Sequence, residues 1–193
     1  MKLSILICSI FERRRELSGL MDILFPQVSP LKDVQVLIDV DDKAKSIGAK
    51  RNDLLQKADG EYIVFIDDDD GIADDYVSKL YHALETGPDC VGIEGVMTIR
   101  GHNPKRFVHS LRFQRWTDNG TFYERTPNHW NPVRRELAIK AGFPEINWGE
   151  DHAYSNNLYP LLKTEVFVDG PVYFYLNNPE ASAANKRRQE CSR

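Results

Sequence analysis

The sequence predicts an α/β protein with a Rossmann-like, mostly parallel central sheet flanked by helices and a smaller mixed or antiparallel portion. Two observations support this class. Up to about residue 90, near-continuous apolar runs alternate with segments whose apolar residues have helical spacing, which is the signature of right-handed βαβ units. After Pro88 the rhythm changes to shorter segments that resemble strands.

The first two strand–helix units follow in order. The run LSILICSI at 3–10 is apolar almost throughout, as expected of a strand that is buried on both faces. Apolar residues over 17–24 share one helix face, and Pro26 should end that helix. A second buried strand is expected at 34–38, and a helix over 43–57.

A third unit completes the parallel part. EYIVFI at 61–66 is the third buried strand. Asp74 and Asp75 are suited to begin a helix, because acidic residues cap an N-terminus and complement its dipole. Apolar residues over 77–84 continue this helix until Gly87 and Pro88 end it.

The remaining elements are shorter. We expect strands at 90–100 and 105–116, and short helices at 131–144 and 150–160. A final pair of strands joined by a Gly-Pro turn is expected at 166–176. At 193 residues the chain suits a single domain.

Composition excludes several classes of protein. The net charge of −4 gives no overall attraction to nucleic acid or anionic membranes. Three distant cysteines, Cys8, Cys90 and Cys191, indicate neither a disulfide framework nor a cysteine zinc site. The short N-terminal apolar run has no signal-peptide cleavage site and is too short to cross a membrane. We therefore expect a cytoplasmic protein without a transmembrane segment.

A run of four aspartates, 67–70, follows the third strand directly. Ligands of open α/β sheets bind at the carboxyl ends of the strands. Because side chains alternate along an extended chain, Asp67 and Asp69 should face the same way and together bind a divalent cation, Mg²⁺ or Mn²⁺. The alternative is a solvated acidic loop in which Asp70 or a later aspartate caps a helix.

Three segments carry a resemblance to a known family. LSILICSIFER, VLIDVDDKAKSIGAKRNDLLQKADGEYIVFIDDDD and WGEDHAYSNNL resemble, in this order, family 2 glycosyltransferases with the GT-A fold, particularly small bacterial and phage members. The resemblance covers roughly residues 2–90 and 126–160. It implies a nucleotide-sugar donor, a UDP-sugar by expectation, a metal-binding DxD motif and inversion at the anomeric carbon.

The resemblance also assigns the donor side. Asp67 and Asp69 match the DxD pair, with Asp69 as the direct metal ligand and Asp67 as a contact to ribose or metal. Asp39, at the end of the second strand, matches the aspartate that contacts the nucleotide base, although Asp41 is an alternative. Arg51 matches a basic residue that holds the base or the diphosphate. The backbone around Ser9 lies where the nucleotide would pass.

On the acceptor side, Asp151 matches the aspartate that acts as general base. The alternative is that GED only begins a helix, with acids that favour its dipole. Acceptor contacts are expected from Glu150, Trp148, His129 and Trp130, although tryptophan and histidine side chains in such positions are often structural. Trp116 and His152 are further candidates.

The resemblance divides the single GT-A domain into a nucleotide-sugar-binding half, 1–90, an acceptor-side half, 91–180, and a flexible basic tail, 181–193. The QxxRW-type motif of processive synthases is out of place, since FQRW at 113–116 precedes GED. A processive polysaccharide synthase is therefore not expected.

The expected function is an inverting, metal-dependent glycosyltransferase that transfers a sugar to an acceptor hydroxyl. Two alternatives are a sugar nucleotidyltransferase and a non-catalytic nucleotide-sugar-binding module. The first usually needs a glycine-rich phosphate loop after the first strand, and CSIFERRR has no glycine there. The acceptor is left open between a glycan, a protein and a modified nucleic-acid base, and the oligomeric state is open too.

Overall fold

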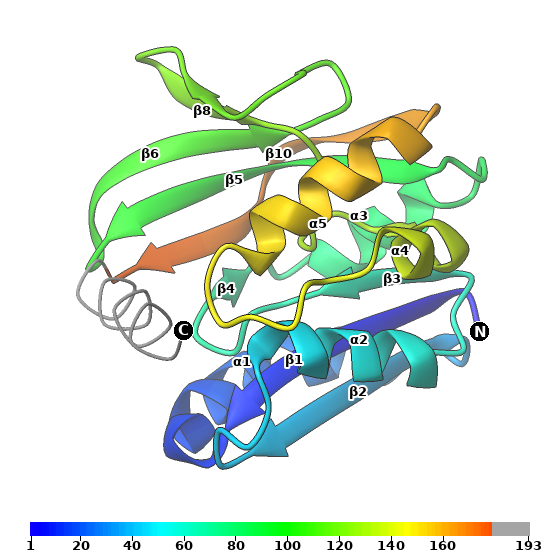
Figure 1. Ribbon diagram of the computed structural model, residues 1–193, viewed down its shortest axis with the longest axis vertical. Coiled ribbons are helices and arrows are strands. Elements are labelled where there is room, and N and C mark those ends of the chain that lie inside the picture. The colour runs from blue at the N-terminus through cyan, green and yellow to red at the C-terminus, as the bar shows by residue number, and fades with distance from the viewer. Residues whose placement is uncertain (179–193) are drawn as a thin grey trace.

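The computed structural model describes residues 1–178 and shows one mixed ten-stranded sheet with helices on both faces (Figure 1). The predicted basic tail, 181–193, lies outside the described residues. The strands run in the order β2-β1-β3-β9-β5-β6-β8-β7, and β10 pairs with β5 and with β4. The same sheet therefore passes through both predicted halves of the chain.

The first half has the predicted strand–helix alternation. Strand β1 pairs in parallel with β2 on one side and with β3 on the other, which confirms the parallel part of the sheet. The elements of this half are β1 (Leu3–Ile10), η1 (Phe11–Arg13), α1 (Arg14–Val28), β2 (Val34–Asp41), α2 (Ile47–Lys57), β3 (Tyr62–Phe65), β4 (Gly71–Ile72) and α3 (Tyr76–Ala83).

The second half is mixed, as expected. Strand β5 pairs antiparallel with β6 and parallel with β10, and short β9 joins β3 to β5 by antiparallel pairs. Its elements are β5 (Cys90–Ile99), β6 (His102–His109), β7 (Thr117–Asp118), β8 (Phe122–Arg125), β9 (Val133–Arg134), α4 (Arg135–Ala141), α5 (Glu150–Leu158), η2 (Tyr159–Leu161) and β10 (Glu165–Asn177).

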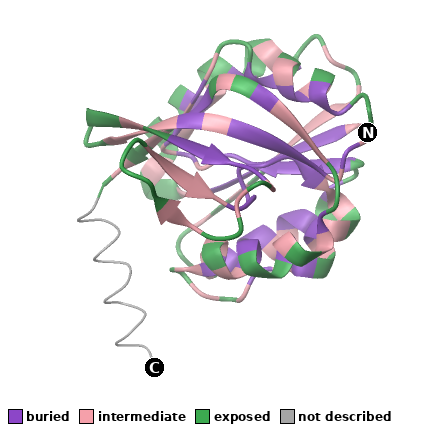
Figure 2. Cartoon of the chain, turned by 90° about the horizontal axis from the view of Figure 1, so that it is seen from above, coloured by how far each residue is buried: buried purple, intermediate pink, exposed green. Residues whose placement is uncertain are grey.

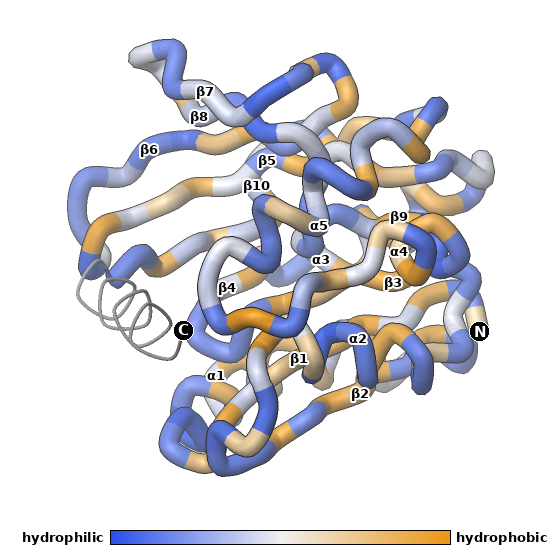
Figure 3. Tube along the Cα trace, in the orientation of Figure 1, coloured by the Kyte–Doolittle hydropathy of each residue, from blue (hydrophilic) through white to orange (hydrophobic). Residues whose placement is uncertain are grey.

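Two apolar layers cover the sheet. Alternate residues of β1 enter opposite layers: Ile5 packs with α1 and α3, whereas Leu6 packs with α2, α4 and α5. This is why the strand is apolar along its whole length. Figure 2 shows the buried strands in the centre between exposed helix faces. Figure 3 shows hydrophobic residues on β1 to β3, whereas hydrophilic residues predominate along β6.

The predicted strand pair at 166–176 is wrong. The structure has one long strand, β10, which stays beside β5 but shifts register around Pro171. Gly170 has φ +79°, a left-handed conformation that glycine adopts without steric cost. The Gly-Pro pair therefore makes a bulge in a continuing strand instead of a reversal.

Three local predictions also differ from the structure. Helix α1 continues past Pro26 to Val28, with Ser29 N–H donating to the Phe25 carbonyl at 3.0 Å, because a proline near a helix end removes only one hydrogen bond. The predicted strand at 105–116 ends at His109 as β6. Asp75 holds the N-cap position of α3, but its side chain caps nothing and pairs with Lys79 instead.

No helix within residues 1–178 combines the length and the apolar character that crossing a lipid bilayer requires.

Candidate donor and acceptor site

The carboxyl ends of β1, β2 and β3 place three segments at one rim of the sheet. Ile10 of β1 lies opposite Asp41 of β2, and Leu6 lies opposite Phe65 of β3. The backbone N–H of Ile66 still donates to the Leu6 carbonyl at 3.0 Å. The aspartate run 67–70 therefore starts beside the end of β1, at the rim where the sequence predicts it.

The aspartates do not continue as an extended chain. The N–H of Asp70 donates to the carbonyl of Asp67 at 3.2 Å, which closes a turn. The extended chain that the alternation requires is therefore absent, and Asp67 and Asp69 have different protein partners. The expectation of alternation fails because the strand ends before the run begins.

Asp67 is held by three donors. Arg51 Nη2 donates to its Oδ1 at 2.9 Å, while Trp130 Nε1 at 3.1 Å and His129 Nε2 at 3.3 Å lie against its Oδ2. Burial alone would raise the pKa of Asp67, but the charges of His129 and Arg51 outweigh burial and hold this pKa far below its usual range. Asp67 is thus a fixed negative charge whose side chain is 29% exposed.

Asp68 and Asp70 are structural. Asp68 is buried and accepts hydrogen bonds from Ser9 Oγ at 2.6 Å and Arg13 Nη1 at 2.8 Å. Asp70 is also buried and accepts from Tyr173 Oη at 2.8 Å and from the Leu176 N–H at 3.0 Å. These two aspartates tie the turn to β1 and to β10.

Asp69 is different because its side chain is 37% exposed and its one ion pair joins Oδ2 to Arg13 Nη1 at 3.1 Å. Burial, together with the charges of Asp67 and Asp68, raises its pKa to about 6, although Arg13 acts in the opposite direction. The Asp69 carboxylate is therefore only partly compensated, since Arg13 is the one cation that pairs with it within residues 1–178.

Asp39 and Asp41, the two candidates for contact with the nucleotide base, differ in their hydrogen-bond partners at the end of β2. Asp41 Oδ1 accepts from Lys50 Nζ at 2.7 Å, and its Oδ2 accepts from the Lys45 N–H at 3.0 Å. In the described part of the chain, no donor reaches the Asp39 carboxylate. Buried Lys50 also donates to the carbonyl of Ser9, which joins β1 to α2 at the rim.

Arg51 is buried and links the two halves of the site. Its Nη1 donates to Glu150 Oε1 at 2.8 Å, in addition to the bond from Nη2 to Asp67. The guanidinium also lies over the rings of Phe65 and Phe143, at 5.7 and 5.4 Å from their centroids. Arg51 therefore connects the aspartate run to the start of α5.

The GED sequence begins helix α5, with Gly149 as N-cap. Glu150 is buried against Arg51, whereas Asp151 is partly exposed and its Oδ1 accepts from the His152 N–H at 2.8 Å. Trp148 lies just before the helix with 44% of its surface exposed. Of the acidic pair, only Asp151 faces solvent enough to meet an acceptor directly.

His129 and Trp130 lie behind Asp67 and belong to the interior. They are 2% and 9% exposed, and Trp130 stacks on Tyr173 at 4.8 Å and on His109 at 5.4 Å between ring centroids. The structure thus brings both side chains to Asp67, as part of the aromatic layer that supports it.

Residues 1–178 contain no group of three or more histidine, cysteine, aspartate or glutamate side chains arranged to enclose a metal ion. A cation at this rim would need oxygens from a ligand as well. Mg²⁺ commonly binds in this way, through one or two carboxylates, water and substrate phosphates. Asp69, a partly exposed carboxylate whose negative charge is destabilised, has the chemistry for that role.

The sequence did not reveal four supporting residues: Arg13, Lys50, Asp68 and Tyr173. Arg13 was one of three consecutive arginines, and spacing gave no reason to prefer it. The one available signal was the position of Lys50, four residues before Leu54 and therefore on the apolar face of the predicted helix. A charged residue on such a face needs a partner.

Comparison with solved structures shows the class of fold. S. aureus TarS 1–349 in complex with UDP-GlcNAc matches with a TM-score of 0.72 and 18% identity over 92% of this chain and 59% of that chain. A mannosyltransferase from Pyrobaculum calidifontis, PcManGT, in complex with GDP-Man and Mn²⁺, matches with a TM-score of 0.59 and 12% identity over 98% and 61%. The fold is the GT-A fold, as expected, and the chain spans about three fifths of the length of these structures.

The family model for glycosyl transferase family 2 matches residues 26–143. The chain belongs to glycosyl transferase family 2, which confirms the resemblance noted in the sequence. No curated protein sequence matches the chain.

Proposed function

We propose that the protein is an inverting, metal-dependent glycosyltransferase that moves a sugar from a nucleotide-sugar donor, a UDP-sugar, to an acceptor hydroxyl. Family membership supports the transfer of a sugar. The likeness to TarS, which binds UDP-GlcNAc and UDP, and to PcManGT, which binds GDP-Man and Mn²⁺, supports a nucleoside diphosphate donor with a divalent cation.

The observation that carries the proposal is that the four aspartates differ in how many protein donors hold them. Donors reach both carboxylate oxygens of Asp67, Asp68 and Asp70. Asp69 has a single ion pair among the described residues, from Arg13 to Oδ2. Asp69 is therefore the proposed ligand for Mn²⁺ or Mg²⁺. A bound cation would stabilise the charge that develops on the departing nucleoside diphosphate.

The chain's own residues would position the donor. Asp39, whose carboxylate accepts from no donor among residues 1–178, contacts the nucleotide base, whereas Asp41 is occupied by Lys50. The nucleotide passes the backbone at Ser9. Arg51 fixes Asp67, which contributes negative charge and a contact to the ribose or the cation.

Asp151 is the proposed general base. An acceptor hydroxyl needs a base when it attacks, and a partly exposed carboxylate at the start of α5 can accept that proton. The new bond to the anomeric carbon forms on the side of Asp151 while the bond to the diphosphate breaks on the side of Asp69. One displacement inverts the anomeric centre, with no covalent intermediate.

The acceptor half provides the remaining contacts in this proposal. Trp148 is exposed next to the base and can lie against a sugar face. Glu150, His129 and Trp130 are buried, so they act on the acceptor through Arg51, Asp67 and Asp151 rather than by direct contact. Residues 1–90 then supply most donor contacts, and residues from 91 onward supply the acceptor side.

The test is a panel of nucleotide sugars with Mn²⁺ or Mg²⁺, in which release of the nucleoside diphosphate measures transfer or hydrolysis. The protein should turn over at least one UDP-sugar. Asp151→Asn should abolish turnover while UDP still binds, and Asp75→Asn, an exposed acid on α3, should leave turnover unchanged. The proposal fails if no donor binds or reacts, and pyrophosphate release from a nucleoside triphosphate would favour a nucleotidyltransferase.

A further inference from the structure

Arg125, the last residue of β8, has a guanidinium held in one orientation. Its Nη1 donates to the carbonyls of Thr117 at 3.0 Å and Glu124 at 2.9 Å. Its Cζ lies 5.1 Å from the ring centroid of Trp116 and 4.9 Å from that of Tyr123. Two carbonyls and two aromatic rings therefore fix a planar cation before any ligand arrives.

The cation lacks an acidic partner. In residues 1–178 no carboxylate lies within ion-pair distance of Arg125. By contrast, Arg13, Arg51 and Arg134 each have a carboxylate oxygen at 3.1 Å or less. Burial lowers the pKa of Arg125, although the more distant charges of Asp118 and Asp151 act to raise it. The guanidinium has thus lost hydration without gaining a counter-ion.

The same unit packs against α5. The indole of Trp116 meets the ring of His152 edge-on, with centroids 4.9 Å apart. Trp116 Nε1 donates to Thr126 Oγ1 at 2.9 Å, and that hydroxyl lies 2.7 Å from Ser155 Oγ. Two contacts one helical turn apart therefore seat this aromatic and cationic unit on the helix that begins with Asp151.

We propose that Arg125 is the anion-binding residue of an acceptor subsite, which takes the phosphate or carboxylate group of an anionic acceptor. This inference rests on the proposed function, in which Asp151 activates the acceptor hydroxyl. The anion pairs with Arg125, and the neighbouring sugar or polyol carbons lie against Trp116. The acceptor hydroxyl is then directed toward Asp151, whose own charge keeps the anionic group at the Arg125 end.

Preorganisation supports this assignment over a surface role. An arginine that is already oriented loses little side-chain freedom on binding, and its fork matches carboxylate and phosphate oxygens. Arg115 is close in sequence and exposed, and in the described chain its guanidinium contacts no ring or carbonyl. It provides a matched control of equal charge.

Saturation-transfer difference NMR with small probes tests the subsite. Glycerol 3-phosphate, glycerate and glycerol are each added to the protein with saturating UDP and Mg²⁺, so that the donor site is occupied. We expect signals from the two anions and little from glycerol. Arg125→Gln should weaken anion binding about tenfold, as for the loss of one charge-assisted pair, whereas Arg115→Gln should bind like the unaltered protein.

The outcomes separate the possibilities. A stronger signal from glycerol 3-phosphate assigns the subsite to phosphate, and a stronger one from glycerate assigns it to carboxylate. Equal signals from glycerol and the anions, or unchanged anion binding in Arg125→Gln, would overturn the inference. UDP signals report the donor site independently: their presence without anion signals refutes only the subsite, and their absence refutes the proposed function. Arg125→Met also removes the charge, and it replaces the glutamine variant with the same expected loss if that one does not fold.

Discussion

Asp67 and Glu150, from opposite halves of the sequence, share the buried guanidinium of Arg51, which donates to them at 2.9 and 2.8 Å. One carboxylate belongs to the proposed donor side and the other lies beside the proposed base. Arg51 therefore sets the distance between the two sides of the site. A single side chain with this role should matter both for stability and for turnover.

Arg51→Met should cost about 3–5 kcal/mol of the free energy of unfolding, because it leaves buried Glu150 without its counter-charge and removes one of the three donors to Asp67. Urea denaturation measures this loss. Lys79→Met, which removes an exposed pair with Asp75 on α3, should cost only about 0.3–0.5 kcal/mol. Equal effects of the two variants would show that Arg51 does not hold the site together.

Arg13→Gln should raise the affinity of the free protein for Mn²⁺ about tenfold. Arg13 Nη1 lies 2.8 Å from Asp68 and 3.1 Å from Asp69, so its positive charge opposes a cation at Asp69. Electron paramagnetic resonance of free Mn²⁺ gives the affinity.

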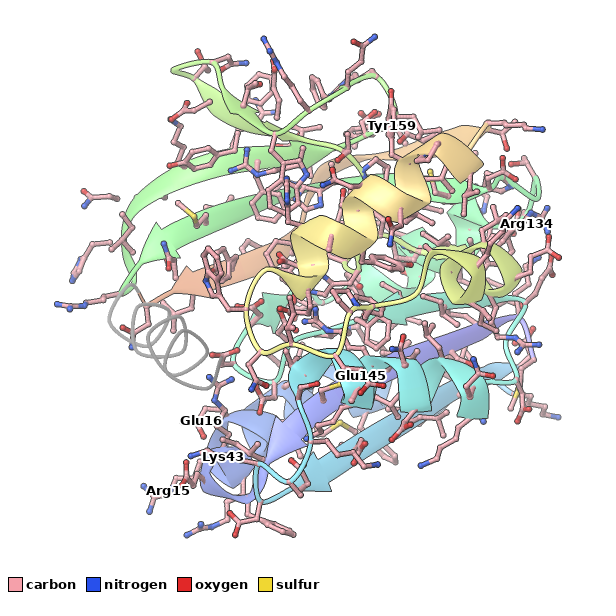
Figure 4. The ribbon with its side chains drawn as sticks, viewed as in Figure 1. Arg15, Glu16, Lys43, Arg134, Glu145 and Tyr159 are labelled. Atoms are coloured by element: carbon pink, nitrogen blue, oxygen red, sulfur yellow. The ribbon has the colours of Figure 1, made fainter. Side chains whose placement is uncertain are left out.

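Arg15→Gln is the matched control for Arg13, since Figure 4 shows Arg15 at the outer edge of the molecule. It should leave Mn²⁺ binding unchanged. If Arg13→Gln weakened Mn²⁺ binding, Arg13 would instead be orienting Asp69 for the cation.

Mn²⁺ binding should also depend on pH in a range where an ordinary carboxylate does not titrate. The pKa of Asp69 is raised to about 6, and a cation must displace its proton below that pH. Affinity should therefore fall about tenfold between pH 7 and pH 5, and level off above pH 7. Calorimetric titration at fixed ionic strength measures it, and a flat profile over this range would contradict the assignment.

Gly48→Ala should destabilise the protein by about 1–3 kcal/mol, as expected of overpacking. A Cβ at Gly48 would lie 1.9 Å from the carbonyl oxygen of Pro144, so the loop that leads to α5 would have to move. Figure 4 shows Glu145 of this loop over α2. The midpoint temperature of thermal unfolding should decrease. The rate of donor turnover should decrease too, because the loop positions Asp151.

Gly19→Ala is the control for that substitution. Gly19 lies in α1 with nothing within 4 Å of an added Cβ, so alanine should stabilise the helix by about 0.5–1 kcal/mol. If both alanine variants behaved alike, the close approach of α2 to the loop would not constrain the site.

Much of the fold could be predicted from the sequence because burial leaves a strong pattern. Strand β1 is covered on both faces, and its unbroken apolar run shows this directly. The bulge at Gly170 could not be separated from a turn, since Gly-Pro suits both. The pairing of β10 with β5 on both sides of the bulge is a contact distant in sequence, and it shows that the strand continues.

The position of the site could be predicted from the sequence, but the hydrogen-bond and ion-pair partners within it could not. A strand's end fixes where Asp67 to Asp70 lie, whereas their partners come from β1, η1, α2, the segment before β9, and β10. No spacing within the aspartate run identifies those partners. The assignment of Trp130 to the interior follows from rings such as Tyr173, which lie far from it in sequence.

Binding of Mn²⁺ in the presence of UDP tests the central claim most directly, with the unaltered protein compared with Asp69→Asn. The account predicts that UDP and Mn²⁺ strengthen each other's binding in the unaltered protein, and that the substitution removes this mutual effect while the fold is retained. Equal Mn²⁺ and UDP binding by both proteins would contradict it.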